Sequence, residues 1–412
     1  MSDPTPLWKR LLGFGLLPAL AAVSPLLVLP VVSRTAGAEG WASAIAGEAV
    51  GTFAAIAIAY GWTTVGPALV SIAGSDERRG RLYRDALLVR LLTAAVALPA
   101  MAIICAFVAA PGFEWLSILM GLQGALIAMS FTWFAVGVAD PRSIIFYDAI
   151  PRLAVAALAA LAIAATGIVE LYPLAGIAVT IVGTGVYSAR LLRRYPTAWP
   201  PLREVPGLFR IGAPVALNDA ALGAYSAFPT PLVTVTSSGI AAAGFASGDK
   251  MLKLGQFLPL TLANALQSWT AEARGADRRR RLRLALLAHG LSGVAGWIVL
   301  AAVGPWASFV LFGSEAATTT AVLVPLGAAF AMYSVRTSMT RHVLFPAGES
   351  RAVMWATLAA TLTGVPAMIA LSIPFGPVGV ALGYALTETV ATVMLVRRTA
   401  RSLKALEAEV VS

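Results

Sequence analysis

The sequence is poor in the residues that build most enzyme and metal sites. Its 412 residues include one cysteine, Cys105, and two histidines, His289 and His342. One cysteine excludes an intrachain disulfide, and this small set of ligands excludes the usual tetrahedral zinc site. No serine stands in a nucleophile elbow, and neither histidine has an evident carboxylate partner. We therefore expect a protein that is not an enzyme and needs no cofactor.

Charge is also scarce, because 12% of the residues are charged and 58% are hydrophobic. A soluble domain carries about 25% charged residues, and one this apolar would expose aggregating patches. Long apolar runs alternate with short basic clusters, as in chains whose helices satisfy their backbone groups inside lipid. The net charge of +10 does not indicate nucleic-acid binding, because the basic residues are divided among short loops. The sequence predicts an all-α polytopic membrane protein surrounded by membrane lipids.

About 20 apolar residues cross a bilayer as a helix. The stretch 11–33 is long enough to span and is followed by further spans, so it is expected to stay in the protein rather than to be a cleaved signal peptide. Two stretches, 40–71 and 209–236, exceed the minimum and contain Gly or Pro, so we expect them to tilt, kink or protrude. The twelve predicted spans are 11–33, 40–71, 86–110, 113–138, 149–168, 172–192, 209–236, 240–268, 283–303, 316–340, 351–373 and 377–396.

The basic residues predict how these spans are oriented. With a cytoplasmic N-terminus every second loop is basic, and 26 of the 30 Lys and Arg residues lie on the cytoplasmic side. Short cytoplasmic loops of membrane proteins carry this excess. An error of one helix would break the alternation, so we expect both termini in the cytoplasm. Arginine greatly exceeds lysine and alanine is abundant, which is consistent with a GC-rich bacterial genome, so the expected location is a bacterial plasma (inner) membrane. The four other basic residues are Arg34, Lys250, Lys253 and Arg336.

The chain matches itself at an offset of 201 residues. Chance similarity between Ala- and Gly-rich helices is the alternative, but the matches include acidic residues at one membrane depth. A six-helix unit returns to its starting side, so we expect two lobes, 1–200 and 201–412, related by a pseudo-twofold axis along the membrane normal around a central cavity. Among the matches, Gly47-Glu48 aligns with Gly248-Asp249, and Gly74, Asp76, Arg78 and Arg79 align with Gly275, Asp277, Arg279 and Arg280.

Ionisable residues in or at the ends of predicted spans are the candidate functional residues, because such residues are costly in lipid and usually face a partner or a water-filled interior. The basic ones are expected to form a cationic cavity for a phosphate-bearing substrate, since ammonium and guanidinium groups bind phosphate oxygens. The acidic ones are expected to balance this charge or to bind a coupling ion, H⁺ or Na⁺. The basic candidates are Lys250, Lys253, Arg34 and Arg336, and the acidic candidates are Glu48, Asp249, Asp219 and Glu388.

Simpler interpretations stay open for several of these residues. Lys253 lies four residues after Asp249 and can pair with it, which would neutralise both charges. Lys250 projects about 100° away from Asp249 around the helix, so we do not expect these two side chains to pair side by side. Arg336 is near the cytoplasmic end of its span and can snorkel there. Arg34 is near the outer interface and can serve as an anchor.

Four motifs resemble the polysaccharide biosynthesis transporters, the O-antigen flippase type within the multidrug/oligosaccharidyl-lipid/polysaccharide (MOP) exporter superfamily. They are similar to that family's first helix and following loop, its aromatic fourth helix, its eighth helix and the glycine-rich start of its twelfth. The likeness extends over essentially the whole chain. The motifs are LPVVSRTAG at 29–37, FTWFAVG at 131–137, ASGDKMLKL at 246–254 and PVGVALG at 377–383.

The resemblance implies two lobes that rock between inward-open and outward-open states, and a polyprenyl-pyrophosphate-linked oligosaccharide as substrate. Lys250 would attract the pyrophosphate, with Arg34 and Arg336 at the two mouths of the cavity. Other membrane proteins of polysaccharide assembly are the expected partners.

Three other functions were weighed against this one. A proton- or sodium-coupled multidrug or organic-cation antiporter of the same fold would need an anionic cavity, whereas cations match or outnumber acids in these helices. A membrane enzyme acting on polyprenyl phosphates lacks an acid–base or metal cluster in this sequence. A structural scaffold is disfavoured by the clustered intramembrane charges. The flippase is therefore the leading hypothesis, with the antiporter as its alternative.

Overall fold

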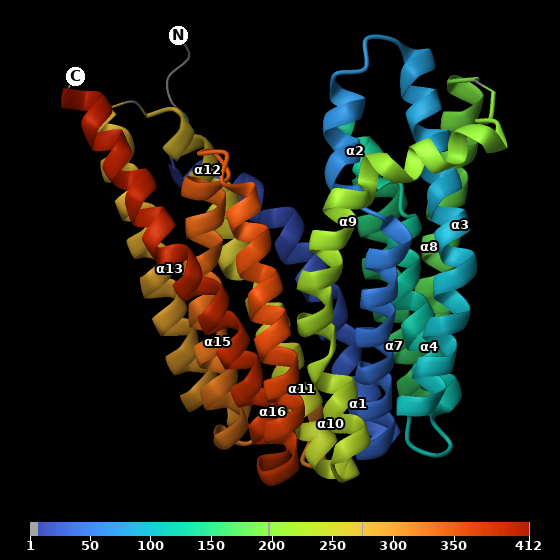
Figure 1. The fold of residues 1–412 in the computed structure, drawn as a ribbon. Coiled ribbons are helices and arrows are strands. Elements are labelled where there is room, and N and C mark those ends of the chain that lie inside the picture. Colours follow the sequence, from blue (N-terminus) through green and yellow to red (C-terminus); the bar gives the residue numbers. More distant parts are fainter. Residues whose placement is uncertain (1–6, 197, 274, 412) are drawn as a thin grey trace. The chain divides into compact units, whose positions relative to one another are not determined.

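The computed structural model describes the backbone of residues 7–196, 198–273 and 275–411. It describes the side chains of these residues except 7–23, 202, 214, 268, 276 and 406–411. All regular structure in this part of the chain is helical (Figure 1). Its contacts form two compact units: the first unit is Ser24–Val235, and the second unit is Thr236 onward together with the start of the chain. The lobe boundary between residues 200 and 201 stays a prediction.

Long helices form the frame of the first unit. Within it α3, α4, α7 and α8 stand side by side as columns, with α3 packed on α4, α4 on α8 and α7 on α8 (Figure 1). One element, η2, is a π-helix, and η1 and η3 are short 3₁₀-helices. The elements are α1 (Leu7–Ala59, in this unit from Ser24), α2 (Trp62–Ser71), α3 (Asp76–Val108), α4 (Glu114–Leu126), η1 (Ile127–Met129), α5 (Thr132–Gly137), α6 (Pro141–Ile144), η2 (Ile145–Ala149), α7 (Ile150–Thr166), α8 (Leu171–Arg194), η3 (Leu202–Glu204), α9 (Val205–Ala227) and α10 (Pro229–Thr236).

The second unit is built around α13, α15 and α16, each of which packs on the other two (Figure 1). A π-helix, η4, continues α15 toward the loop that precedes α16. The elements are α11 (Gly239–Gly255), α12 (Phe257–Ala271), α13 (Gly275–Ala302), α14 (Gly304–Phe312), α15 (Thr320–Ser338), η4 (Met339–Leu344) and α16 (Ser350–Val411).

The described helices agree with the all-α membrane protein predicted from the sequence. Eight stretches are long and apolar enough to cross a membrane. Two of them contain an interruption, because the backbone is non-helical at Gly37 in α1 and at Gly376 in α16, with φ of 68° and 52°; each glycine lies between two predicted spans. Glycine adopts such positive φ angles without the Cβ penalty of other residues. The pairs α9–α10 and α11–α12 cover the predicted spans 209–236 and 240–268.

Small residues bring α1 and α4 into close contact in the first unit. A Cβ at Gly47 would collide with the carbonyl oxygen of Ser117, and one at Gly51 with that of Gly121. Small residues four positions apart allow such close helix packing in membranes. In the second unit a Cβ at Gly248 would lie 3.0 Å from the hydroxyl of Thr318. Both partners of this contact lie 201 residues after Gly47 and Ser117, so the internal repeat is also a repeat of packing.

Replacing Gly51 with leucine is expected to abolish folding of the first unit, because the side chain has no space between α1 and α4. The measurement is the yield of monodisperse protein after detergent extraction, together with its melting temperature. Gly185→Leu is the matched control, since a Cβ at Gly185 on α8 meets no atom within 4 Å. A Gly51→Leu protein with the yield and melting temperature of Gly185→Leu would contradict the packing described here.

Some predicted spans are not continuous helices. The span 40–71 breaks at Tyr60, where φ is 47°, so that α1 ends and α2 begins. The span 113–138 breaks at Ser130, which has an extended ψ of 145°. Backbone groups freed by such breaks need partners inside a membrane. The guanidinium of Arg90 donates a 3.1 Å hydrogen bond to the Ser130 carbonyl and so satisfies one of them.

Candidate functional site

The first charged pair of the second unit lies on α11. The Lys253 ammonium donates to the Asp249 carboxylate at 2.6 Å, and the Asp249 side chain is completely buried. The four-residue spacing predicted this pair. Asp249 is ten residues into α11, roughly 15 Å from its first residue. The charge of Lys253 is therefore neutralised by Asp249, as the simpler interpretation of this lysine expected.

Lys250 is the cation next to this pair. Its side chain is buried, with 8% of the residue exposed. It follows Asp249 directly and therefore projects from a different side of α11 than the Asp249–Lys253 pair. A buried ammonium is costly to desolvate, so its position in the core of a helical unit marks it as a candidate functional group.

Arg336 and Glu388 form the second pair and join two helices. Arg336 on α15 donates from Nε and Nη2 to the two carboxylate oxygens of Glu388 on α16, both at 3.0 Å. The two side chains are 10% and 1% exposed. This is the two-pronged geometry in which arginine binds carboxylates most strongly. The alternative in which Arg336 snorkels to the cytoplasmic end is wrong, because the Glu388 carboxylate holds the guanidinium inside the unit.

The charged residues named above are grouped here as the charged cluster, defined as Asp249, Lys250, Lys253, Arg336 and Glu388. They lie on α11, α15 and α16, which pack on one another. Each carboxylate is engaged by a cation, and three cations stand against two carboxylates. The formal charges of these five side chains sum to +1.

The remaining predicted residues lie in the first unit and do not form one site. Arg34 is exposed near the turn at Gly37. Glu48 is half-buried on α1, in electrostatic range of Tyr172. Asp219 is half-buried on α9, with its carboxylate 3.4 Å from the amide nitrogen of Asn218. Their roles as substrate-binding or coupling groups stay predictions.

Two arginines of the basic loops are buried, which the sequence did not reveal. Arg84 is 6% exposed and donates to the carbonyl oxygens of Tyr195 at 2.8 Å and Leu192 at 3.4 Å. It thereby satisfies carbonyl groups at the end of α8, which have no partner within the helix. Arg90 is 2% exposed and lies 5.0 Å from the ring centre of Trp133. Both arginines thus hold α3 to its neighbours instead of only signalling orientation.

The two histidines, which looked unrelated in the sequence, meet in the second unit. His289 on α13 and His342 on η4 have ring centres 5.6 Å apart. The ring nitrogens of His289 face the carbonyl oxygens of Ala285 at 2.9 Å and Pro259 at 3.2 Å. Which ring nitrogen donates depends on the tautomer. Both side chains are buried, so the pair is a polar contact between α13 and η4.

Comparison with known proteins supports the resemblance read from the motifs. No protein-family profile matches the sequence. The chain is 20% identical over 331 residues to a protein of Shigella dysenteriae named "Putative O-antigen transporter". The aligned region covers 79% of this chain and 83% of that protein.

Solved structures show the same fold. The lipid II flippase MurJ in an inward closed conformation gives a TM-score of 0.67 at 12% identity, over 96% of this chain and 90% of that one. An inward-facing multidrug resistance transporter of the MATE family, of the MOP superfamily, gives 0.61 at 17% identity, over 98% and 95%. The predicted resemblance to MOP exporters and the all-helical transporter fold are confirmed. The chain is a multi-pass membrane protein.

Proposed function

We propose that this protein is a flippase that moves a polyprenyl-pyrophosphate-linked oligosaccharide across the membrane by alternating access. The observation that carries the proposal is the charged cluster of the second unit, in which Lys250 is buried on the helix that also carries the Asp249–Lys253 pair. A net positive group at this depth attracts a pyrophosphate through charge-assisted hydrogen bonds. The similarity to a protein named as an O-antigen transporter and the fold shared with a lipid II flippase support this substrate class.

An organic-cation antiporter is the second candidate, because MATE transporters share the fold. Such a function needs carboxylates that accept a cationic drug. Asp249 and Glu388 each already bind a cation of the protein. Glu48 and Asp219 would have to supply the anionic site. The charged cluster therefore favours the anionic lipid-linked substrate.

Ion coupling belongs to the same proposal. The coupling ion is H⁺ or Na⁺, with Glu48 and Asp219 as the groups that would take it up. The proposed location is a bacterial plasma (inner) membrane with both termini in the cytoplasm, beside other membrane proteins of polysaccharide assembly.

The proposal is tested by expressing the protein in a bacterial strain that lacks its own O-antigen transporter. We expect surface O-antigen to reappear, measured on the outer face of intact cells, when the glycan is one that the protein accepts. Resistance of the same cells to ethidium is measured in parallel. Restored resistance without surface glycan, over a panel of donor strains, would replace the flippase with the antiporter.

A further inference from the structure

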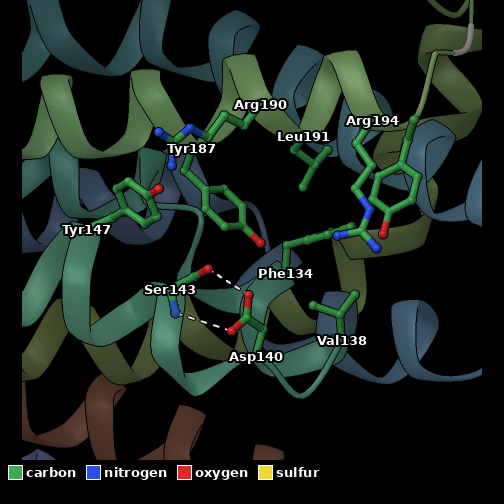
Figure 2. A pocket seen from close by; sticks show the side chains of 10 residues that line it. Phe134, Val138, Asp140, Ser143, Tyr147, Tyr187, Arg190, Leu191 and Arg194 are labelled. Atoms are coloured by element: carbon green, nitrogen blue, oxygen red, sulfur yellow. Dashed lines mark hydrogen bonds between the residues drawn. The ribbon is translucent and has the colours of Figure 1, made fainter.

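A pocket of about 250 Å³ lies in the first unit, away from the predicted site residues. It opens between α5, the α6–η2 segment and the last turns of α8, at the end of the unit that carries the arginines of α8 (Figure 2). Its volume is below the roughly 300–1,000 Å³ of pockets for drug-sized ligands. The pocket therefore suits a headgroup-sized moiety.

Two arginines line this pocket without a carboxylate partner. Arg190 and Arg194 are one turn apart on α8, and like charges at this spacing repel each other. In the described part of the chain neither guanidinium forms an ion pair, and each lies over a tyrosine ring instead. The Arg190 guanidinium is 5.2 Å from the ring centre of Tyr147, and that of Arg194 is 5.4 Å from the ring centre of Tyr195. Their N–H groups are left to bind an anion.

Aromatic side chains form the walls beside these arginines. Tyr187 is 9% exposed, stacks on Phe131 with ring centres 4.0 Å apart, and turns its hydroxyl into the pocket (Figure 2). Among the described residues this hydroxyl has no hydrogen-bond partner. Flat aromatic faces with hydroxyl groups at their edges present both an apolar surface and polar groups. This combination suits the C–H face and the hydroxyl groups of a sugar ring.

Asp140 is the acidic residue of the pocket. Its carboxylate accepts hydrogen bonds from the Ser143 hydroxyl at 2.6 Å and the Ser143 backbone N–H at 3.3 Å (Figure 2). An ionised carboxylate accepts about four hydrogen bonds, so acceptor positions remain toward the pocket. Sugar hydroxyls can donate hydrogen bonds to these positions, whereas the Asp140 carboxylate would repel a phosphate placed directly against it. With two arginines against one carboxylate, the pocket still carries a net positive charge.

Unusual backbone geometry builds the pocket. Ala139, directly before Asp140, has a φ of 56°, which is costly for a residue other than glycine. Tyr147 sits in the π-helix η2, and a Cβ at Gly183 of α8 would collide with its carbonyl oxygen. Single π-helical turns and strained residues gather at functional sites. Both features here hold side chains of the same pocket.

We propose that this pocket binds the phosphate and the adjoining sugar of a glycosyl phosphate. Arg190 and Arg194 bind the phosphate, and Tyr187 and Asp140 bind the sugar. The inference rests on the proposed function, because it makes the pocket the docking site for the headgroup of the lipid-linked glycan on the face where the substrate enters. Anionic membrane phospholipids and free pyrophosphate share the phosphate chemistry, and binding experiments separate them from the lipid-linked sugar.

The test measures dissociation constants of the full chain in nanodiscs of neutral phosphatidylcholine. The probes are a short-chain prenyl-pyrophosphate monosaccharide, inorganic pyrophosphate and phosphatidylglycerol. We expect the prenyl sugar to bind most tightly, and Arg190→Gln/Arg194→Gln to weaken it at least tenfold. Tyr187→Phe is expected to weaken the prenyl sugar severalfold and to leave pyrophosphate unchanged. Arg193→Gln is the matched control, because Arg193 occupies the same last turn of α8 outside the pocket.

Three results would overturn the inference. They are unchanged binding in the double variant, an equal loss in Arg193→Gln, or phosphatidylglycerol or free pyrophosphate binding as tightly as the prenyl sugar. Lipid movement separates this inference from the proposed function. Wild-type protein that binds through the two arginines but moves no lipid-linked glycan overturns the function and leaves the pocket. Full movement and unchanged binding in the double variant overturn the pocket and leave the function.

Discussion

Replacing Arg336 with methionine is expected to destabilise the protein by about 3–5 kcal/mol, the cost of leaving one member of a buried ion pair without its partner. The carboxylate of Glu388 is 1% exposed, so water does not reach it once the guanidinium is gone. The contact also joins α15 to α16, so its loss loosens two of the three central helices of the second unit. The measurement is the unfolding transition in detergent, followed by temperature or denaturant.

The double variant Arg336→Met/Glu388→Leu distinguishes the charge from the packing. Replacing both members of a buried pair with apolar residues of similar size is often neutral, so we expect it to recover most of the lost stability. We also expect the double variant to retain lipid movement, because Arg336 and Glu388 form an ion pair with each other. A double variant no more stable than Arg336→Met would show that the ion pair is not what the single substitution breaks. A stable double variant that moves no lipid would assign Arg336 to substrate binding.

Replacing Lys250 with methionine is expected to lower transport of the lipid-linked oligosaccharide at least tenfold while the protein stays folded. Methionine fills a similar volume but carries no charge, so the excess positive charge of the charged cluster disappears. A charge-assisted hydrogen bond contributes about 1.5–3 kcal/mol, which corresponds to roughly ten- to hundredfold in binding. The measurements are the affinity for the lipid-linked substrate and its rate of movement in proteoliposomes.

Two variants serve as controls for Lys250→Met. Lys250→Arg keeps a cation and is expected to retain more transport than the methionine variant. Lys253→Met removes a cation from the same helix, but one that Asp249 engages. Because it leaves the buried Asp249 carboxylate without this lysine, its main effect is expected on stability. Equal transport in Lys250→Met and wild type would remove Lys250 from the site.

The sequence was a good guide to everything set by local spacing. The alternation of apolar spans and basic loops predicted the all-helical membrane fold, and the four-residue spacing predicted the Asp249–Lys253 pair. The offset of 201 residues predicted that Gly47 and Gly248 are equivalent, and their contacts with Ser117 and Thr318 agree with this.

Contacts between residues far apart in the chain could not be predicted from the sequence. Arg336 and Glu388 are 52 residues apart, so no helical spacing joins them, and the cytoplasmic end of the span looked like an equally good place for the guanidinium. Arg84 and Arg90 belong to a basic run by charge, and only the packing of α3 against other helices buries them. The meeting of His289 and His342 likewise depends on how α13 and η4 pack.

The pocket of the first unit could not be predicted because it depends on unusual backbone geometry. Its arginines and aromatic residues are visible in the sequence, but the backbone that brings them together is not. A positive φ at Ala139 and a π-helix over Ile145–Ala149 cannot be recognised from the amino-acid composition. Ordinary residues adopt these conformations when tertiary packing requires them. The aromatic motif at 131–137 was the available clue, since it supplies Phe134 and the Phe131 ring beneath Tyr187.

The most direct test of the central claim is transbilayer movement of a fluorescent polyprenyl-pyrophosphate oligosaccharide in proteoliposomes that contain only wild-type protein. Movement is followed as the loss of fluorescence to a membrane-impermeant quencher, with protein-free liposomes as the baseline and uptake of an organic cation measured alongside. The account predicts protein-dependent movement of the lipid and no uptake of the cation. Uptake of the cation with no movement of the lipid, across several glycans and under imposed proton and sodium gradients, would contradict it.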